Sequence, residues 1–431
     1  MLVSVLRMCD FKKQDFFVYF RYILQKMERL AGAKVMLASG ASSQCQQKSS
    51  LNGVALDRVR CRLSSFSLSP RPVSCRHFQQ NSFRLQVTCE AVKKAAVLTP
   101  PLKQLTLSEP KLAHQFVKAF APATVANLGP GFDFLGCAVD GLGDYVTAEV
   151  SNAVPAGQIQ ISTITGDNGR LSLVAGNNCA GIAGKATLEL LGVQSVGIML
   201  NLHKGLPLGS GLGSSAASAA AAAAAVNGLF GSPLSKAQLV QAGLESEATV
   251  SGYHADNVAP SLMGGFVLVR SYDPLHLIPL SFPGGKDLYF VLVIPDFEAP
   301  TKEMRAVLPT EISMKKHIAN CSQASALVTA ILQGDASLLG AALSSDTIVE
   351  PQRAPLIPGM NAVIAASKQA GAYGCTISGA GPTAVAITDT EEKGKAVAAA
   401  MVNAFNVHGN LKAEAHVNRL DREGARLIES H

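Results

Sequence analysis

The segment 204–215 constrains the fold more than any other part of the chain. It reads KGLPLGSGLGSS, so that Gly209, Gly211 and Gly213 alternate with other residues. An almost pure alanine run follows at 216–226, and alanine has the highest helix propensity. Glycine lets backbone N–H groups turn toward a ligand, and a helix N-terminus adds N–H donors and partial positive charge. The segment therefore predicts a phosphate-binding loop that leads into a helix.

Other glycine-rich motifs fit this segment less well. No Gly-Lys-Ser/Thr sequence follows, which excludes a Walker A loop, and Ser214 takes the place of the third glycine of the dinucleotide-binding fingerprint. A tight turn before a closely packed helix is the purely structural alternative. Ser214 or Ser215 is expected to cap the helix.

Strands and helices alternate around this loop, which indicates an α/β or α+β layered fold. Apolar runs and alternation predict strands at 145–150, 158–164, 196–203, 264–269, 288–294, 374–377 and 383–387. Helical spacing predicts helices at 179–191, 234–247, 318–332, 338–344 and 360–369. A further strand is expected to end at Pro122, and His254-Ala255-Asp256-Asn257 is expected to form a loop.

Charge is unevenly distributed along the chain. Residues 1–90 hold 14 Lys and Arg against 5 Asp and Glu, whereas residues 91–431 hold 23 against 26. Residues 36–89 contain 11 serines and a single acid, Asp57, which is typical of an organellar transit peptide and favours plastids. We therefore expect a leader at 1–90, a linker at 91–113 and a location in the chloroplast stroma. An ordinary disordered tail is the alternative.

Composition argues against several kinds of partner and site. The chain has no Trp and 6% aromatic residues, and its basic excess lies in the leader, so no nucleic-acid partner is expected. The most apolar stretch is mainly alanine, so no membrane partner is expected. Cys137, Cys179, Cys321 and Cys375 are scattered outside the leader without a C-x-x-C pair, which argues against a zinc site or a disulfide framework.

Three segments, at 122–133, 207–217 and 379–382, together resemble the three motifs of the GHMP kinases. These include the galactose, homoserine, mevalonate and phosphomevalonate kinases, and the resemblance spans residues 114–430. The string HADNVAP at 254–260 is most similar to the homoserine kinases of plant plastids.

The resemblance implies an α+β fold of two domains. An ATP-binding domain at 114–285 would resemble domain 2 of ribosomal protein S5, and a domain at 286–431 would be ferredoxin-like. ATP would lie on the glycine-rich loop, and L-homoserine in a cleft between the domains.

Residue roles follow from the same resemblance, position by position. The expected ATP-binding residues are Asn178, Pro207, Leu208, Gly209, Ser210, Gly211, Leu212, Gly213, Ser214 and Ser215. The expected acceptor-binding residues are Asn127, Asp133, His254, Asp256, Asn257, Arg305 and Arg353. The expected catalytic residues are Asn257, Asp256, Thr301 and Arg305.

Electrostatics agrees with these roles. Asp133 can face an ammonium group, and Arg305 and Arg353 can hold an amino-acid carboxylate by paired N–H···O bonds. Asn257 is expected to bond to the attacking hydroxyl. A free aspartate has a pKa of about 4, far below that of an alcohol, so Asp256 is expected to orient its neighbours rather than act as a strong base.

Phosphoryl transfer also needs a metal ion, and Mg²⁺ prefers oxygen ligands. The resemblance implies that Glu247 binds Mg²⁺ together with the hydroxyl of Ser215 or Ser214, and Glu245 remains an alternative carboxylate ligand.

The reaction that the resemblance implies converts ATP and L-homoserine to ADP and O-phospho-L-homoserine, a step toward threonine. Another small-alcohol kinase of the superfamily and a catalytically silent metabolite sensor are the alternatives. The sequence leaves the oligomeric state open, a homodimer included.

Overall fold

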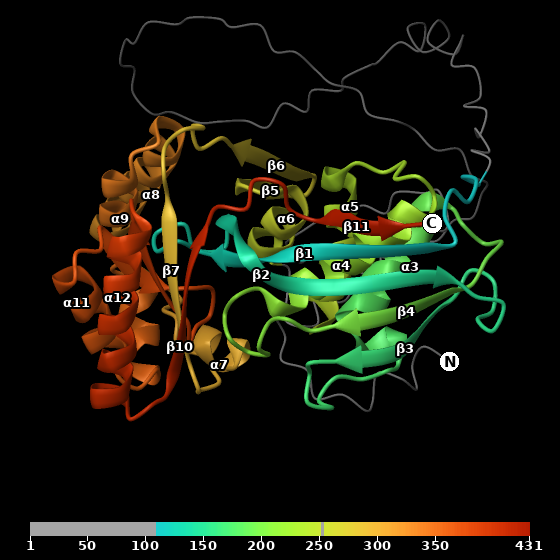
Figure 1. Ribbon diagram of the computed structural model, residues 1–431. Helices are drawn as coiled ribbons and strands as arrows, with labels where there is room; N and C mark the ends of the chain where they lie inside the picture. The colour runs from blue at the N-terminus through green and yellow to red at the C-terminus, as the bar shows by residue number, and fades with distance from the viewer. Residues whose placement is uncertain (1–108, 251–253) are drawn as a thin grey trace, which may run out of the picture. The chain divides into compact units, whose positions relative to one another are not determined.

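The computed structural model describes residues 109–250 and 254–431 (Figure 1). The expected leader, with most of the expected linker, lies outside these residues. The described chain forms two sheets with helices packed on them, which confirms the α+β class. The expected domain boundary at residues 285 and 286 stays a prediction.

The first sheet has seven strands, and its main path runs β11-β1-β2-β4-β3, with β5 on β2 and β6 on β5. Its strands are β1 (Phe116–Ala126), β2 (Leu135–Val150), β3 (Ile159–Thr165), β4 (Ile198–His203), β5 (Phe266–Tyr272), β6 (Leu275–Leu280) and β11 (Arg426–Ser430). Strands β3 and β4 run parallel, joined through a helix, and the other pairs are antiparallel. The last strand of the chain thus completes the first sheet beside β1.

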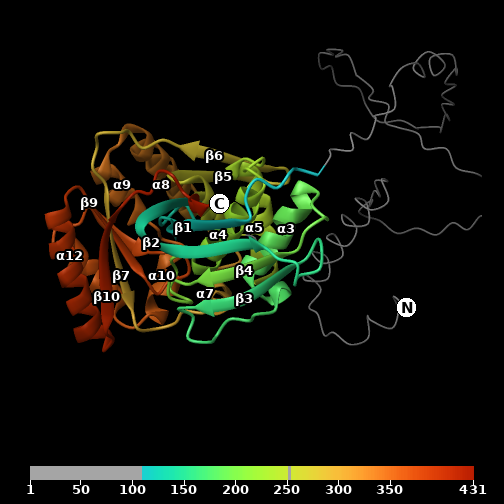
Figure 2. The same cartoon turned by 45° about the vertical axis from the view of Figure 1, so that its right-hand side comes forward.

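Four helices accompany this sheet: α3 (Cys179–Leu191), α4 (Ser214–Leu229), α5 (Lys236–Val250) and α6 (Ala255–Met263). Helix α4 holds the alanine run, and all its residues except Ser215 are buried. It packs against α3, α5, α6, β1 and β2, as Figures 1 and 2 show. Methyl side chains let all these neighbours approach closely, so the alanine run fixes the position of the loop that precedes it.

The second sheet has the order β10-β7-β9-β8 and is antiparallel throughout. Its strands are β7 (Tyr289–Pro295), β8 (Gly374–Ile377), β9 (Ala384–Thr388) and β10 (Ala413–Arg419). The helices of this part are α7 (Thr301–Ala306), α8 (Met314–Gln333), α9 (Ala336–Leu343), α10 (Glu350–Arg353), α11 (Met360–Gln369) and α12 (Glu391–Ala404). A βαββαβ succession with this strand order is the ferredoxin-like arrangement, as expected.

Two predictions about the bounds and type of an element were wrong. Strand β1 does not end at Pro122 but runs on to Ala126. Its pairing with β11 ends at Phe120, and its pairing with β2 continues past Pro122 after a shift in register. A bulge of this kind accommodates a residue without an N–H group. The expected loop at 254–257 is instead the start of α6, with His254 as its N-cap.

Helix α6 is stabilised by tertiary packing. Ala255, Val258, Ala259 and Leu262 are fully buried, and their spacing is that of one helix face. The polar residues of the expected loop are therefore presented from a rigid first turn.

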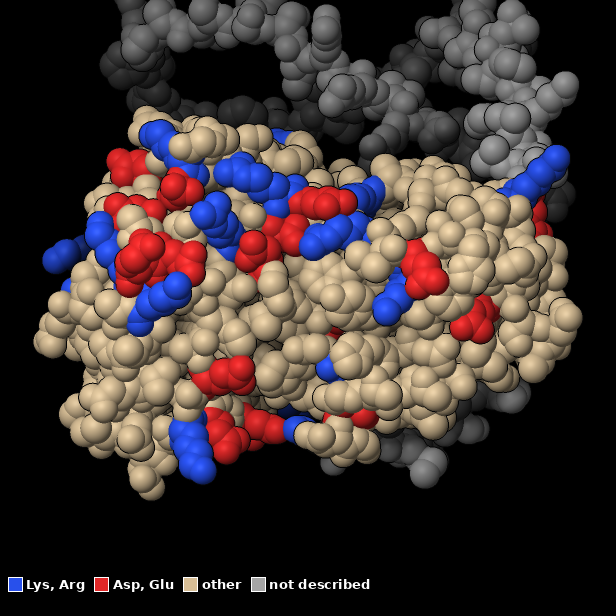
Figure 3. All heavy atoms as spheres, in the orientation of Figure 1, with Lys and Arg blue, Asp and Glu red and all other residues tan. Residues whose placement is uncertain are grey.

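The surface carries charges of both signs. Figure 3 shows Lys and Arg intermixed with Asp and Glu on the face it draws, without a continuous basic area. Within the described residues, no helix has the length and apolar character needed to cross a bilayer.

Candidate active site

A cavity of about 340 Å³ lies where the glycine-rich loop meets the start of α6 and the helices α7 and α10. It brings together all the predicted site residues except Pro207 and Leu212. The predicted residues that line it are Asn127, Asp133, Asn178, Leu208, Gly209, Ser210, Gly211, Gly213, Ser214, Ser215, Glu247, His254, Asp256, Asn257, Thr301, Arg305 and Arg353. Pro207 is exposed beside the cavity, and Leu212 is fully buried in the core beneath the loop.

The glycine-rich loop needs its glycines for two reasons. Gly211 and Gly213 have φ angles of 83° and 67°, where a side chain is strained. A Cβ at Gly213 would also lie 2.0 Å from Thr124 Oγ1, and one at Gly211 would lie 2.5 Å from the Ser378 carbonyl oxygen. The loop is therefore clamped between β1 and the third glycine-rich motif.

Helix α4 begins at Ser214, and Gly213 is its N-cap, so the prediction that a serine caps this helix was wrong. The Ser214 hydroxyl donates to the Leu206 carbonyl oxygen at 3.2 Å, and the Ser215 hydroxyl donates to Glu247 Oε1 at 2.6 Å. No side chain in the described part of the chain caps the first turn of α4. Its N–H groups point to where an anion can bind.

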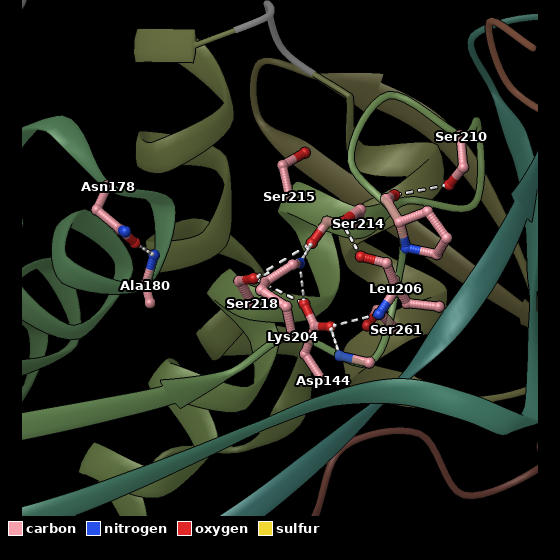
Figure 4. Close-up of polar contacts among 12 residues, drawn as sticks. Asp144, Asn178, Ala180, Lys204, Leu206, Ser210, Ser214, Ser215, Ser218 and Ser261 are labelled. Atoms are coloured by element: carbon pink, nitrogen blue, oxygen red, sulfur yellow. Dashed lines mark hydrogen bonds and ion pairs between the residues drawn. The ribbon is translucent and has the colours of Figure 1, made fainter. Parts of the chain in front are cut away.

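A buried ion pair supports the loop from below (Figure 4). Lys204 donates to Asp144 Oδ2, to the Ser214 carbonyl oxygen at 2.7 Å and to Ser218 Oγ at 2.9 Å. Both charged side chains are almost fully buried. Burial lowers the pKa of Lys204, and the neighbouring Asp144 opposes that shift.

Asp144 completes this support through its second oxygen. Its Oδ1 accepts from the backbone N–H groups of Gly205 and Leu206 at 3.0 and 3.2 Å. The network therefore joins β2, the loop entrance and the first turn of α4, which fixes the loop before any ligand binds.

Glu247 and Ser215 form the oxygen-rich end of the cavity. Glu247 is 2% exposed, whereas Glu245 is exposed and lies outside the cavity. A carboxylate and a hydroxyl 2.6 Å apart beside the glycine-rich loop are oxygen donors that suit Mg²⁺, an ion that commonly takes further ligands from phosphates and water. No cluster of three or more His, Cys, Asp or Glu side chains in the described chain could hold a metal alone.

The first turn of α6 presents its polar side chains toward the other end of the cavity. Thr124 Oγ1 on β1 donates to Asn257 Oδ1 at 3.0 Å, which leaves the Asn257 amide group to donate elsewhere. Asp256 is 2% exposed, and its Oδ1 has no hydrogen-bond partner among the described residues. Burial raises the pKa of Asp256 to about 7, with His254 opposing the shift and Asp133 adding to it.

Asp133 and Arg305 bond to each other across the cavity. Arg305 Nη1 and Nη2 donate to the two Asp133 oxygens, each at 2.8 Å. Asp133 has a φ of 64°, and its N–H donates to Asn127 Oδ1 at 3.0 Å. The strained backbone thus directs this carboxylate toward α7.

Arg353 is a buried cation of a different kind. It is 2% exposed, and its Nε and Nη1 donate to the carbonyl oxygens of Met304 and Gly379 at 3.0 and 2.9 Å. Within residues 109–250 and 254–431, no Asp or Glu forms an ion pair with it. Burial, together with the positive charge of nearby Arg305, lowers the pKa of Arg353 to about 10.

Two predicted ligands have structural contacts of their own. Asn127 Nδ2 donates to the Gly379 carbonyl oxygen at 2.8 Å and thereby ties the first motif to the third. Asn178 is the N-cap of α3, where its Oδ1 accepts from Ala180 N and its Nδ2 donates to the Ser172 carbonyl oxygen. Their expected contacts with homoserine and adenine stay predictions.

Sequence reasoning missed four residues of the site and its support: Thr124, Phe132, Asp144 and Lys204. Phe132 lines the cavity with Arg305 and Arg353 over its ring. Phe132 stands beside Asp133 within the first motif, at 122–133, so its place at the site was predictable from that motif. Asp144 lies on β2 and Lys204 directly follows β4, and nothing in the sequence brings the two residues together.

Comparison with known proteins agrees with this geometry. The family "GHMP kinases N terminal domain" matches residues 178–265, and "GHMP kinases C terminal" matches residues 327–407. A homoserine kinase of Arabidopsis thaliana is 66% identical over 329 residues, which are 76% of this chain and 89% of that protein. A homoserine kinase of Chloroherpeton thalassium is 42% identical over 72% of this chain and 99% of its own length.

The fold is likewise shared with a solved structure. The crystal structure of homoserine kinase from Cytophaga hutchinsonii has a TM-score of 0.69 and 41% identity, and it covers 74% of this chain and 99% of its own. Identity of this extent, over nearly whole relatives, establishes the family. The chain therefore belongs to the homoserine kinases of the GHMP kinase superfamily.

Proposed function

We propose that this chain transfers the γ-phosphoryl group of ATP to the side-chain hydroxyl of L-homoserine, which yields ADP and O-phospho-L-homoserine for threonine biosynthesis. The relatives described above carry the name of this activity. The observation that carries the proposal is the Arg353 guanidinium, a buried cation held by backbone carbonyls at the cavity.

A buried cation without a carboxylate partner is costly unless a ligand supplies the anion. Homoserine supplies a carboxylate, and a guanidinium can meet it with two parallel N–H···O bonds. The Asp133 carboxylate can receive the ammonium of the same molecule. Mevalonate and galactose have no ammonium group, so this pairing of charges favours an amino acid.

The opposite end of the cavity suits ATP. The glycine-rich loop and the first turn of α4 offer backbone N–H groups to the phosphates. Ser215 and Glu247 would hold Mg²⁺, which neutralises phosphate charge when it is bound. The Lys204–Asp144 pair keeps the loop in place while the phosphates bind.

Asn257 is placed to orient the acceptor hydroxyl, because Thr124 fixes its side-chain oxygen and so its amide direction. The hydroxyl oxygen forms the new P–O bond, the bond between the γ-phosphorus and the β,γ-bridging oxygen breaks, and the hydroxyl proton passes to a phosphoryl oxygen. Positioning and electrostatics supply most of the rate in such transfers. Asp256 orients Asn257 or His254 and does not act as a strong base. Thr301 and Arg305 complete the acceptor side.

The test compares acceptors in a coupled ADP-release assay. Homoserine, mevalonate, galactose and shikimate are supplied at equal concentrations with ATP and Mg²⁺. We expect homoserine to have the highest kcat/KM by at least ~100-fold. A higher value for another acceptor would identify a different small-alcohol kinase, and no ADP release with any of them would favour a silent sensor.

Arg353→Ala tests the observation that carries the proposal. Losing one partner of a desolvated charge contact costs ~2–5 kcal/mol, so the KM for homoserine should rise at least ~30-fold while the KM for ATP stays nearly constant. The loss should largely vanish on 3-aminopropan-1-ol, which is homoserine without its carboxylate. A loss of equal size on both acceptors would assign Arg353 to phosphate binding or to the fold.

We also propose that residues 1–90 direct the protein to the chloroplast stroma and take no part in catalysis. Their serine-rich, acid-poor composition supports this. A chain that begins near residue 91 should retain full activity, and loss of folding in it would refute the proposal. A homodimer is a further prediction, which sedimentation of the same shortened chain can test.

A further inference from the structure

Phe132 lies between the glycines of the first motif and Asp133, and it lines the cavity. The Arg305 guanidinium carbon is 5.4 Å from the centroid of its ring, and that of Arg353 is 5.1 Å away. Both distances fall within the range of cation–π contacts. One half-buried ring therefore faces two cations that come from different helices.

The two guanidinium groups lie over the same ring, and the charge of Arg305 lowers the pKa of Arg353, so the two cations repel each other. Asp133 neutralises Arg305 through the two-point pair, but Arg353 has only backbone oxygens for partners among the described residues. The negative face of an aromatic ring attracts a guanidinium plane, and the two groups stack well. The ring thus opposes the repulsion that would otherwise separate the arginines.

The ring has its place independently of the arginines. The turn before it is tight, because a Cβ at Gly131 would lie 2.6 Å from the Asn127 carbonyl oxygen. The residue after it is fixed by the Asp133 N–H bond to Asn127 Oδ1. The backbone on both sides of Phe132 is therefore fixed by contacts that do not involve either arginine.

We propose that Phe132 is a positioning residue that keeps the Arg305 and Arg353 guanidinium groups together, so that both can contact the carboxylate of the bound amino acid. This rests on the proposed function, because the carboxylate belongs to homoserine. Phe132 then acts on acceptor selection through the arginines and leaves ATP binding unaffected.

The test uses Phe132→Leu, Phe132→Tyr and the control Phe120→Leu. Phe120 lies under the Arg426 guanidinium, 4.6 Å from the ring centroid, on strand β1 outside the cavity. The control thus removes the same kind of contact away from the site. The full chain is assayed with ATP and Mg²⁺ on homoserine and on 3-aminopropan-1-ol, and thermal unfolding of each variant is recorded.

We expect Phe132→Leu to raise the KM for homoserine about tenfold, with little change in kcat or in the KM for ATP. Phe132→Tyr keeps an aromatic face and should restore the wild-type KM to within about twofold. The loss should disappear on 3-aminopropan-1-ol, which gives the arginines no carboxylate to hold. Phe120→Leu should leave all these constants unchanged.

Three results would overturn the positioning role while leaving the proposed function intact. The first is that Phe132→Leu has the wild-type KM for homoserine. The second is that Phe132→Leu raises the KM equally for homoserine and 3-aminopropan-1-ol. The third is that Phe132→Tyr raises the KM for homoserine as much as Phe132→Leu does. The last two would mean that Phe132 supports the fold or the turn alone. Failure of the wild-type protein to phosphorylate homoserine would instead refute the proposed function itself.

Discussion

The Asp133 carboxylate accepts two hydrogen bonds of 2.8 Å from the Arg305 guanidinium, so the residues expected to meet opposite ends of an amino acid are paired with each other. Their side chains are 37% and 40% exposed, and a pair so open to water adds little stability. Its importance therefore lies in binding. A zwitterionic ligand can offer each partner the opposite charge, whereas a ligand with one charge leaves a partner unmatched.

Asp133→Asn tests the ammonium contact. The substitution keeps the shape and removes the charge, so the KM for homoserine should rise at least ~10-fold, since one charge-assisted bond contributes roughly 1.5–3 kcal/mol. The comparison acceptor is 4-hydroxybutanoate, which is homoserine without its ammonium group, and on it the effect should vanish. Equal losses on both acceptors would show that Asp133 acts only through the position of Arg305.

Glu247→Gln tests the metal site. It removes the charge beside Ser215, and kcat should fall at least ~100-fold, as when one electrostatic contact to the transition state is lost. Glu245→Gln is the matched control, two residues away on the exposed side of the same helix. Steady-state rates of both variants over a range of Mg²⁺ concentrations show which of the two carboxylates binds the metal. A drop confined to the control would move the metal ligand to Glu245.

Lys204→Met tests the buried support under the loop. It leaves Asp144 as an uncompensated buried charge, which should cost ~3–5 kcal/mol of unfolding free energy. The control is Lys393→Met, which removes an exposed pair with Asp389 and should cost less than ~1 kcal/mol. Urea unfolding in the absence of nucleotide measures the unfolding free energy of both variants. Similar small losses in the two variants would contradict the supporting role of Lys204.

Asp256 should make stability depend on pH. Its pKa is raised to about 7 in the folded chain, against about 3.9 in an unfolded one, so the folded state holds a proton that the unfolded state has lost. The unfolding free energy therefore falls as pH rises from about 4 to about 7, by up to ~1.4 kcal/mol per pH unit. Above about pH 7 the contribution of Asp256 to the unfolding free energy no longer changes.

Asp256→Asn removes this dependence, so the variant should gain stability relative to wild type between pH 5 and pH 8. Urea unfolding of both proteins at the two pH values measures the difference. Burial also raises the pKa of Glu350 to about 7. Because Glu350 is present in both proteins, its contribution cancels in the difference between their unfolding free energies. A difference between the proteins that does not change with pH would mean that Asp256 is ionised throughout.

Gly213→Ala tests the clamp on the glycine-rich loop. The added Cβ meets Thr124 Oγ1 at 2.0 Å, and the φ of 67° adds strain. Gly192→Ala is the control, because Gly192 has a φ of 70° but no atom within 4 Å of a new Cβ. The control should lose ~1–2 kcal/mol of unfolding free energy. Gly213→Ala should lose clearly more and should no longer bind nucleotide. Equal melting temperatures for the two variants would show that the loop is not clamped.

Local patterns made the glycine-rich loop and several elements predictable. The helix at 179–191, the helix at 360–369 and the strand at 374–377 lie where the sequence placed them, because each has its own periodicity or turn signals. Most predicted site residues also share one cavity, because the motifs that carry them are short and distinctive. The fold class followed from the resemblance rather than from periodicity.

The failures have a common physical cause. The polar residues at the start of α6 predict a loop, whereas burial of the apolar face of this helix decides the structure. The serine hydroxyls were expected to cap α4, but the tertiary partners Leu206 and Glu247 accept their hydrogen bonds instead. The partnership of Phe132 with two arginines likewise exists only after folding. Contacts between distant segments leave no pattern in a single sequence.

The identity of the phosphorylated product tests the central claim most directly. Wild-type protein is incubated with ATP, Mg²⁺ and L-homoserine, and the mixture is followed by ³¹P NMR with proton coupling. The account predicts one new phosphomonoester signal, coupled to the two protons of the terminal side-chain carbon, that grows at the same rate as ADP. Release of ADP with inorganic phosphate alone, or no reaction with homoserine while another alcohol is phosphorylated, would contradict it.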